Sequence, residues 1–383
     1  MKNVPIEDSL YDVAIIGGGL GGLALAIQSV QKGYRTILFE KEKYPFHRVC
    51  GEYISLESWN FLQELGIPLS DLRLPLIRRL KVSAPNGNVL EHQLPLGGFG
   101  ISRYYLDDLL HQVAVKEGVI VMQENRVMDV IYSNDRFTLF TNRGETTAKV
   151  VAGAYGKRSN LDIRWKREFT KKRPGKLNHF IGVKYHVSGN FPSDLISLHN
   201  FKNGYCGISQ VENNKYCLCY LTTAANLRNN RNDVAEMEQK VLMKNPLLKE
   251  VLLSSTKLFD QPLIISQISF NRRSQVENHV LMVGDSAGLI TPLCGNGMSI
   301  ALHASKLAIS EIESFLTGNT SRFDMEQQYA QQWEKHFSRR LAVGRMIQRW
   351  FGSELQSDLL VRSLKPFPKF VSFLIRQTHG ETF

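Results

Sequence analysis

The hydrophobic pattern near the start of the chain changes from that of a buried strand to that of a helix. Residues 11–16 are mostly apolar, as in a strand covered on both faces, and residues 23–30 have the apolar spacing of a helix. A second short apolar run covers residues 35–39. The pattern therefore predicts a strand, a helix and a second strand of a parallel sheet.

The same pattern recurs far downstream. Residues 279–283 predict another buried strand, and the amphipathic segment 299–315 predicts the helix that follows it. Between these two regions, residues 176–266 alternate apolar and polar positions, with turn signals such as Asn203-Gly204. This middle region predicts a mostly antiparallel sheet. The segment 326–379 predicts helices in which basic and aromatic residues are interleaved.

A glycine-rich turn joins the first predicted strand to its helix. Gly17, Gly19 and Gly22 have the G-x-G-x-x-G spacing, which allows a tight turn, close approach of a pyrophosphate and close packing of helix on strand. The second strand ends at Glu40, about 20 residues further on, where an acid accepts hydrogen bonds from ribose hydroxyls. An acid at this position disfavours a 2′-phosphate, so FAD or NAD is preferred over NADP.

A second glycine-rich segment follows the strand predicted at 279–283. Gly284 and Asp285 come at its end, where an acid suits hydrogen bonding to a sugar-like chain. A loop then leads into the predicted helix, and its residues are Pro292, Leu293, Cys294, Gly295, Asn296, Gly297 and Met298. The N-terminus of such a helix stabilises negative charge. NAD enzymes have no obvious need for this second motif, and the two motifs together indicate FAD.

With both motifs, most of the chain resembles the FAD-dependent monooxygenase superfamily, which includes aromatic hydroxylases, flavin-dependent halogenases and geranylgeranyl reductases. The resemblance implies a pyrophosphate at the first glycine motif, the adenosine ribose at Glu40 with Lys41 beside it, and the ribityl chain at Asp285. It implies that Arg48 and Arg103 lie near the flavin and the pyrophosphate, and that the loop from Pro292 to Met298 meets the isoalloxazine ring. An alternative for Arg103 is a simple i,i+4 pair with Asp107.

A third motif of the superfamily is altered in this chain. The hydroxylases carry an Asp-Gly pair with a nearby Arg at the end of a strand, whereas residues 152–159 read AGAYGKRS, without the acid. In the hydroxylases this acid helps to organise the flavin and the reduced pyridine nucleotide. NADH or NADPH therefore remains a candidate electron donor beside a separate flavin reductase or other electron-donating protein. The change favours the reductases and halogenases, which tolerate similar changes.

The candidate catalytic residues lie in the segment PFHRVCGE, residues 45–52. Cys50 resembles the cysteine of a Cys-Gly pair near the active site of geranylgeranyl reductases; its alternative is a small buried hydrophobe. His47 and Glu52 are candidates for proton relay or for ordinary hydrogen bonding. Tyr205 lies in a stretch that loosely resembles a tyrosine motif of the reductases' lipid tunnel, and is a candidate pocket residue; its alternative is a core tyrosine.

Composition sets limits on partners and location. The net charge of +11 favours anionic partners, but no nucleic-acid-binding module accompanies it, so we expect no nucleic-acid binding. Five scattered cysteines suit a reducing compartment, and we expect a cytoplasmic protein with no export signal, no membrane span and no metal site. The basic, aromatic segment 326–379 and the lysine-rich run 166–176 are candidates for peripheral contact with anionic lipid. The alternative for segment 326–379 is a helical cap over the substrate pocket.

These observations predict a mixed α/β fold. It comprises a Rossmann-like FAD-binding domain, a second domain built on an antiparallel sheet that binds a hydrophobic substrate, and a C-terminal helical cap. The expected ranges are 1–75, 100–165 and 267–325 for the FAD-binding domain, 76–99 and 166–266 for the sheet domain, and 326–383 for the helical region.

The expected function is that of an FAD-dependent oxidoreductase. Oxygen insertion into a hydrophobic or aromatic small molecule of a biosynthetic pathway is the leading expectation, and reduction of an isoprenoid-type double bond is the alternative. The halogenases' WxWxIP segment is not found in the chain, which makes halogenation a minor alternative. A flavin-binding module without turnover is the other minor alternative.

Overall fold

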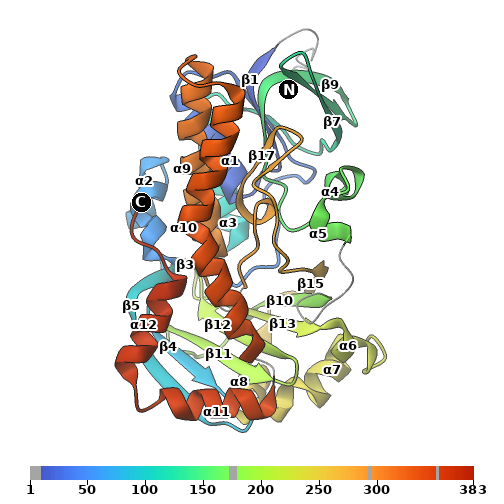
Figure 1. The fold of residues 1–383 in the computed structure, drawn as a ribbon. Coiled ribbons are helices and arrows are strands. Elements are labelled where there is room, and N and C mark those ends of the chain that lie inside the picture. The colour runs from blue at the N-terminus through green and yellow to red at the C-terminus, as the bar shows by residue number, and fades with distance from the viewer. Residues whose placement is uncertain (1–9, 172–178, 292–294, 351–352) are drawn as a thin grey trace.

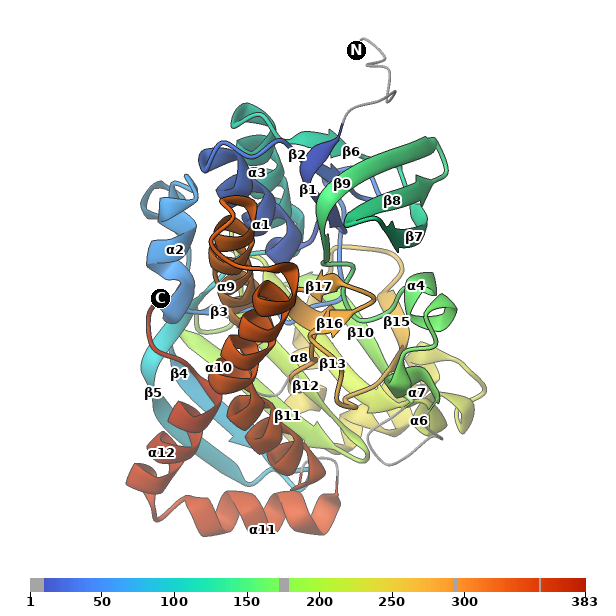
Figure 2. The ribbon, with the colours of Figure 1, turned by 45° about the horizontal axis from the view of Figure 1, so that its top comes forward.

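The computed structural model describes residues 10–171, 179–291, 295–350 and 353–383 (Figure 1). Two sheets lie one above the other, and a long C-terminal helix runs along both of them (Figures 1 and 2). No helix in these ranges is long and apolar enough to span a membrane.

The first sheet has the order β16-β17-β9-β1-β2-β6, with a hairpin attached through β8. β1 pairs in parallel with both β2 and β9, and β17 pairs in parallel with β9. The strands are β1 (Tyr11–Ile16), β2 (Thr36–Phe39), β6 (Ile120–Met122), β7 (Val127–Ser133), β8 (Arg136–Thr141), β9 (Gly144–Gly153), β16 (Val276–Glu277) and β17 (Val280–Met282). β1 is apolar and almost entirely buried, because helices cover the sheet on one side and β7–β8 lies against it on the other.

The helices beside this sheet come from distant parts of the chain. α1 (Leu20–Gln31) packs against α9 (Gly297–Leu316) and α3 (Arg103–Lys116), and Gln28 Nε2 donates to Ser305 Oγ at 3.1 Å. Small residues such as Gly21 permit this contact, since a Cβ there would lie 3.0 Å from the carbonyl oxygen of Ala301. Shorter helices follow at α2 (Trp59–Glu64), α4 (Asn160–Arg164) and α5 (Glu168–Lys171), with 3₁₀ turns at 56–58, 69–71 and 284–286.

The second sheet has the order β14-β10-β13-β12-β11-β4-β5-β3, with β15 beside β10. Its neighbouring pairs are antiparallel except β4 with β11. The strands are β3 (Tyr53–Ser55), β4 (Leu76–Ser83), β5 (Val89–Gly100), β10 (Phe180–Ser188), β11 (Leu195–Phe201), β12 (Gly204–Gln210), β13 (Tyr216–Thr223), β14 (Thr256–Lys257) and β15 (Leu263–Ile268).

The two faces of this second sheet have different chemistry. On β10, Val183, Tyr185 and Val187 join a core with residues of α7 (Val234–Lys240) and α8 (Pro246–Ser254). The alternate residues Lys184 and His186 therefore face the other way, toward the first sheet. Register places Cys219 beside Lys184 and Cys217 beside His186 on this inner face.

The C-terminal helices are α10 (Arg322–Trp350), α11 (Glu354–Leu364) and α12 (Pro368–Thr378). α10 packs on α9 at the level of the first sheet and reaches α12 beside the second (Figure 1). α11 and α12 lie against β5 and β11 at the far end of the molecule. The expected mixed α/β fold, with two sheets and a helical C-terminal region, is confirmed.

Details differ from the sequence prediction at two places. The middle region contains α6 (Ala224–Arg228), α7 and α8 as well as strands, because Asp233 and Asn245 cap helices that interrupt the alternation. β3, within the first range expected for the FAD-binding domain, pairs with β5 in the second sheet. The chain thus passes between the sheets close to the candidate catalytic segment.

Candidate functional site

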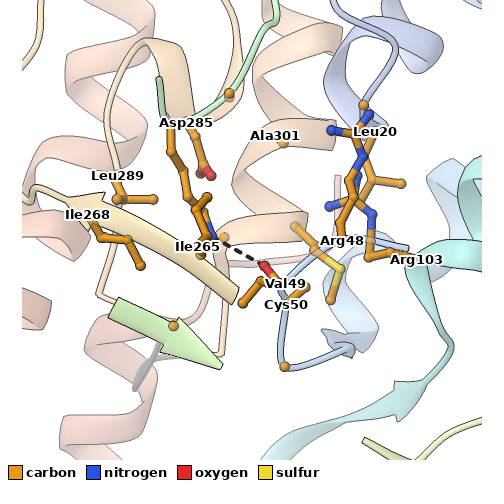
Figure 3. A pocket seen from close by; sticks show the side chains of 18 of the residues that line it. Leu20, Arg48, Val49, Cys50, Arg103, Ile265, Ile268, Asp285, Leu289 and Ala301 are labelled. Atoms are coloured by element: carbon orange, nitrogen blue, oxygen red, sulfur yellow. Dashed lines mark hydrogen bonds between the residues drawn. The ribbon is translucent and has the colours of Figure 1, made fainter. Parts of the chain in front are cut away.

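A single pocket of about 780 Å³ brings together most of the residues selected from the sequence. It runs between the carboxyl ends of β1 and β2 and the inner face of the second sheet. In Figure 3, Arg48 and Arg103 lie on one side, Ile265, Ile268 and Leu289 on the other, and Val49 and Cys50 between them. The pocket therefore has a charged half and an apolar half.

The charged half begins at the N-terminus of α1. A Cβ on Gly17 would lie 2.6 Å from the carbonyl oxygen of Ala154, and one on Gly22 would overlap the carbonyl oxygen of Gly17. A Cβ on Gly19 would meet nothing closer than Arg103 Nη2 at 3.6 Å. The turn is thus packed tightly beneath and open above, where the free N–H groups of α1 attract an anion.

Two arginines lie beside this turn and share one buried aspartate. Arg103 donates to Asp107 at 2.7 and 2.8 Å, so the expected i,i+4 pair exists, and Arg103 also lines the pocket. Arg48 bridges Asp107 and Glu40, at 3.0 Å from each. Burial opposes the charge of Arg103, but Asp107 outweighs it and raises the pKa of the guanidinium. Arg103 is therefore held as a cation beside the glycine turn, and the guanidinium of Arg48 is fixed between two carboxylates.

Glu40 and Asn125 lie at the end of the pocket next to β2. Glu40 accepts hydrogen bonds from the backbone N–H groups of Gly18 at 2.9 Å and Glu42 at 3.0 Å. Asn125 follows β6, is buried and lines the pocket, and neither polar atom of its side chain has a hydrogen-bond partner among the residues that the structure describes. Such a buried amide is costly unless a ligand satisfies it. Lys41 is exposed at the same end of the pocket.

Opposite the glycine turn, the pocket meets the 3₁₀ turn 284–286 and the start of α9. Gly284, Asp285, Gly295, Asn296, Gly297 and Met298 all line it, whereas Pro292 and Cys294 lie outside the described residues. Gly295 has φ +65°, and a Cβ there would lie 3.0 Å from the ring of Tyr53. The nearest atom to a Cβ on Gly297 would be Ile290 Cγ2 at 3.6 Å, which leaves the α9 N-terminus accessible from the pocket.

The altered segment 152–159 forms the end of β9 and the loop beyond it. In this loop Tyr155 precedes Gly156, and its hydroxyl donates to Asp162 at 3.0 Å. Burial and the neighbouring Asp162 raise the pKa of Tyr155, so this hydroxyl stays neutral. Gly156, Lys157 and Arg158 line the pocket, and this loop gives it basic groups in place of a carboxylate.

The apolar half is formed by strands of the second sheet and by Leu289. The apolar residues that line it are Ile196, Leu198, Tyr205, Leu221, Leu263, Ile265, Ile268 and Leu289. Gly182 and Gly207 lie among them, and a Cβ on Gly207 would be in ordinary contact, 3.5 Å from Leu198 Cδ2. The wall is thus apolar with little side-chain volume at its centre, which suits an extended hydrophobic ligand.

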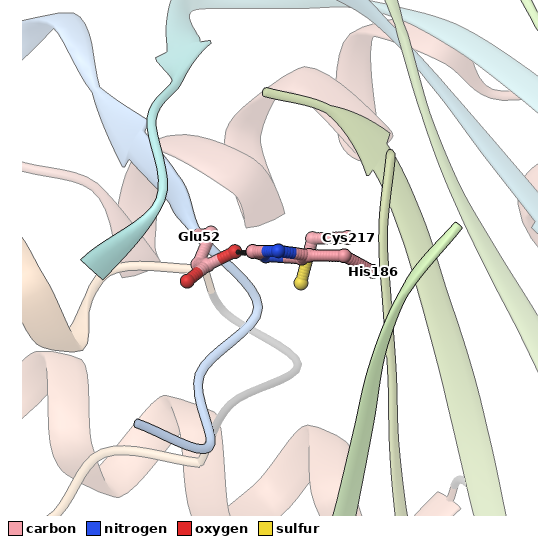
Figure 4. A group of neighbouring side chains, drawn as sticks. All are labelled: Glu52, His186 and Cys217. Atoms are coloured by element: carbon pink, nitrogen blue, oxygen red, sulfur yellow. Dashed lines mark hydrogen bonds and ion pairs between the residues drawn. The ribbon is translucent and has the colours of Figure 1, made fainter. Parts of the chain in front are cut away.

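Cys50 lies where the two halves meet, on a loop held by a buried ionic network. Glu52 pairs with Lys184, whose Nζ also donates to the carbonyl oxygen of Arg48 at 3.1 Å. Glu52 also contacts His186 Nε2 at 2.6 Å (Figure 4), and Cys217 Sγ donates to the carbonyl oxygen of Cys50 at 3.2 Å. These contacts fix the backbone on both sides of Cys50 to β10 and β13.

The pKa values of Glu52 and Lys184 in this network are shifted from their ordinary values. Burial alone would raise the pKa of Glu52, but Lys184 and His186 outweigh it and lower that pKa to about 2. Burial lowers the pKa of Lys184, whereas Glu52 raises it by more, so the net shift is upward. Both groups are therefore charged at neutral pH. His47 lines the pocket nearby, and burial together with Lys184 lowers its pKa to about 4, which makes it a neutral imidazole.

Glu52, His186 and Cys217 also form the group of possible metal ligands found among the described residues (Figure 4). Their ligand atoms lie within 4.8 Å of one another. The ammonium of Lys184 already pairs with Glu52, and burial raises the pKa of Cys217 well above its usual value, which disfavours the thiolate that binds metals. This chemistry fits an ion-pair network better than a metal centre.

Comparison with known families decides the class of cofactor. A family profile described as FAD binding domain matches residues 10–335. The chain belongs to this family. Both expected glycine motifs lie within the matched region.

Two curated relatives match this FAD-binding protein over most of its length. Conditioned medium factor receptor 1 of Dictyostelium discoideum is 22% identical over 365 residues, which cover 88% of this chain and 70% of that protein. A digeranylgeranylglycerophospholipid reductase of Methanococcus vannielii is 22% identical over 360 residues, covering 87% and 84%. The structure of the flavin-dependent brominase Bmp2 superposes with a TM-score of 0.79 at 18% identity, covering 97% and 93%. At this identity the last match shows a shared fold alone.

The residues present in the pocket fit FAD. The open turn above Gly19 suits a pyrophosphate, the carboxylate of Glu40 and the amide of Asn125 suit the adenosine, and the accessible α9 N-terminus suits the flavin end. Asn125 was not predicted from the sequence. Its position after a parallel strand of the Rossmann-like sheet was the signal that could have identified it.

We predict that Asn125→Ala weakens FAD binding about tenfold to a hundredfold, because it removes an amide that FAD would satisfy. Fluorescence titration of the apoprotein measures the change. FMN, which lacks the adenosine half, provides the control, and its affinity should remain unchanged. Equal losses for FAD and FMN would contradict a contact with adenosine.

Proposed function

We propose that this FAD-binding protein reduces a carbon–carbon double bond in an extended apolar substrate. The observation that carries the proposal is the place of Cys50, at the boundary between the charged half and the apolar half of one pocket. The match to a relative named for digeranylgeranylglycerophospholipid reduction supports the choice of an isoprenoid-like substrate.

In this proposal, the wall formed by Leu198, Leu221 and Ile265 orients the substrate and excludes water. Held between the glycine turn and the N-terminus of α9, reduced FAD would supply a hydride, two electrons and one proton, for addition to one carbon of the double bond. The Cys50 thiol donates a second proton to the other carbon and recovers its proton from solvent. The net change is addition of two hydrogen atoms across the double bond.

Glu52 and Lys184 act as positioning residues. They hold the backbone of the loop from Arg48 to Glu52 against β10, and so fix where the Cys50 side chain enters the pocket. His47 is neutral at physiological pH, so it accepts protons more readily than it supplies them.

Cys50→Ala should lower turnover about a hundredfold while FAD content stays unchanged, because a general acid contributes roughly that factor. Geranylgeraniol is the probe, with dithionite-reduced protein under anaerobic conditions and the product measured by mass spectrometry. Cys219→Ala is the matched control. Cys219 lines the same pocket, and burial, followed by the nearby Cys50, raises the pKa of its thiol to about 12. Equal losses in both variants would point to pocket volume instead of proton donation.

Oxygen insertion into an aromatic ring is the second candidate, and His47 favours it. Its imidazole is neutral, and its buried Nδ1 has no hydrogen-bond partner among the described residues. A neutral imidazole accepts a hydrogen bond from a phenolic hydroxyl, a group that a simple alkene lacks.

Dependence on oxygen separates the two reactions. The protein is reduced anaerobically with NADH, NADPH or dithionite and mixed with geranylgeraniol or with a long-chain alkylphenol. A product two hydrogens heavier, formed without oxygen, supports reduction. A product that forms only after admission of isotopically labelled oxygen and carries the label supports insertion and overturns the lead proposal. Reduction of FAD by NADH or NADPH identifies a direct donor, and reduction by dithionite alone favours a separate reductase.

A further inference from the structure

The helical hairpin formed by α11 and α12 has an inner face fixed to the second sheet. Val361, Leu364, Val371 and Ile375 pack into an apolar cluster with residues of that sheet. Asn88 Nδ2 donates to Asp358 at 2.6 Å, and His92 Nε2 lies 2.8 Å from Ser372 Oγ. Each helix therefore has a polar anchor and an apolar face, and the hairpin has a defined orientation.

Its outer face exposes large apolar side chains. Leu355 is 86% exposed, Leu359 61%, Phe367 60%, and Phe370 and Phe373 50% each. The rings of Phe370 and Phe373 stack with centroids 6.2 Å apart. Single exposed apolar residues are common on soluble proteins, but a group of this size on one hairpin marks a contact surface.

The hairpin carries a net positive charge. Between residues 354 and 378 the basic residues are Arg362, Lys365, Lys369 and Arg376, all exposed, and the acids are Glu354 and Asp358. Asp358 is already engaged by Asn88 and Arg362. Arg376 follows Phe373 by three residues and Phe370 by six, so two aromatic side chains and then a basic one lie along one side of α12.

We propose that the outer face of the α11–α12 hairpin docks on the surface of an anionic lipid bilayer. Exposed phenylalanines with surrounding lysine and arginine match the two requirements of an interfacial helix, apolar insertion and attraction to anionic headgroups. The excess of basic over acidic residues on the hairpin favours lipid over a second copy of the chain, whose identical basic face would repel it.

The position of the hairpin connects this surface to the pocket. The apolar cluster beneath the hairpin includes Leu198, Tyr205, Leu221, Ile268 and Leu289, which also line the apolar half of the pocket. The hairpin would thus lie between the bilayer and the residues that form the apolar half of the pocket. Vesicle binding requires no turnover, so it is tested independently of the reaction proposed above.

The holoprotein is sedimented with vesicles of phosphatidylcholine alone or of an equal mixture with phosphatidylglycerol. We expect binding to the anionic vesicles at low salt and weaker binding at high salt. The triple variant Phe367→Ser, Phe370→Ser, Phe373→Ser should bind the anionic vesicles at least about tenfold more weakly than the wild type. The double variant Lys365→Glu, Lys369→Glu should show a loss of similar size. Phe323→Ser is the matched control, since this ring is 68% exposed on α10 and should leave binding unchanged.

FAD content and circular dichroism confirm that each variant is folded, which is expected because the changed side chains are exposed. Equal binding to neutral vesicles, or equal binding by the wild type and the triple variant, would overturn the proposal. The proposal would also be overturned if the wild type formed a concentration-dependent dimer but bound no vesicles, and if the triple variant did not form this dimer. That result would assign the face to a second copy of the chain.

Discussion

Gly17→Ala will bind FAD with an affinity about a hundredfold lower than that of the wild type. Alanine at position 17 must adopt a backbone conformation with φ +104°, which L residues rarely adopt. Its Cβ would also lie 2.6 Å from the carbonyl oxygen of Ala154. The conformation costs roughly 1 kcal/mol and relief of the overlap roughly 1–3 kcal/mol more. The overlap displaces β9 from β1 directly beneath the pyrophosphate position. The bound fraction is measured from the flavin absorbance of purified protein and by titration of the apoprotein.

Gly33→Ala is the control for this variant. Gly33 has φ +84°, which L residues also rarely adopt, but nothing lies within 4 Å of a Cβ placed there. It should lose a similar amount of backbone stability and keep its FAD. If Gly33→Ala lost FAD to the same extent, the effect of Gly17→Ala would reflect general destabilisation of the chain.

Removing the carboxylate of the buried network will have the largest effect on stability. Glu52→Ala leaves the ammonium of Lys184 buried without its partner, which should cost about 3–5 kcal/mol of unfolding free energy. Urea unfolding followed by circular dichroism measures this loss. The double variant Glu52→Gln, Lys184→Met removes both charges and should recover part of it. A double variant as unstable as Glu52→Ala would show that shape, and not charge pairing, sets the cost.

The same network predicts a direction for pH dependence. The folded-state pKa of Glu52 is about 2, below its ordinary value of 4.5, so its contribution is present above pH 4.5 and is lost as pH falls toward 2. The folded-state pKa of His47 is about 4, below its ordinary value of 6.5, so folding stability also falls as the pH drops from about 6.5 to 4. Wild-type stability should therefore fall in two ranges on acidification, and Glu52→Gln should flatten the lower one. Asp194→Ala breaks a solvent-exposed pair with Arg79 and should change the profile little.

Local motifs made the cofactor half of the pocket predictable. Gly17, Gly19 and Gly22 lie within one turn, and Glu40 lies at the end of the next strand, so sequence spacing alone brings them together. Arg48 could be included only because the chain resembles a known superfamily. Asn125 was missed because the short strand β6 that precedes it was not predicted from the sequence.

The network around Cys50 shows what sequence patterns do not contain. Glu52 contacts Lys184 and His186, which are 132 and 134 residues away along the chain. These two side chains point to the inner face because successive side chains of β10 alternate between the two faces of the sheet. In the sequence, both residues look like ordinary polar positions of an alternating strand. Their pairing follows only from the register of β10 with β13 and the approach of the Arg48–Glu52 loop.

The order of elements along the chain has a consequence for synthesis on the ribosome. β17 and α9 complete the first sheet and cover α1, yet they follow the strands of the second sheet in sequence. Until residue 316 has emerged, the β9 edge lacks its neighbour and α1 lacks the helix that packs on it. Most of the second sheet, residues 180–268, becomes available earlier. Most of the apolar wall, except Leu289, can therefore fold before the chain can hold the cofactor, and we expect flavin to be acquired late in synthesis or after release.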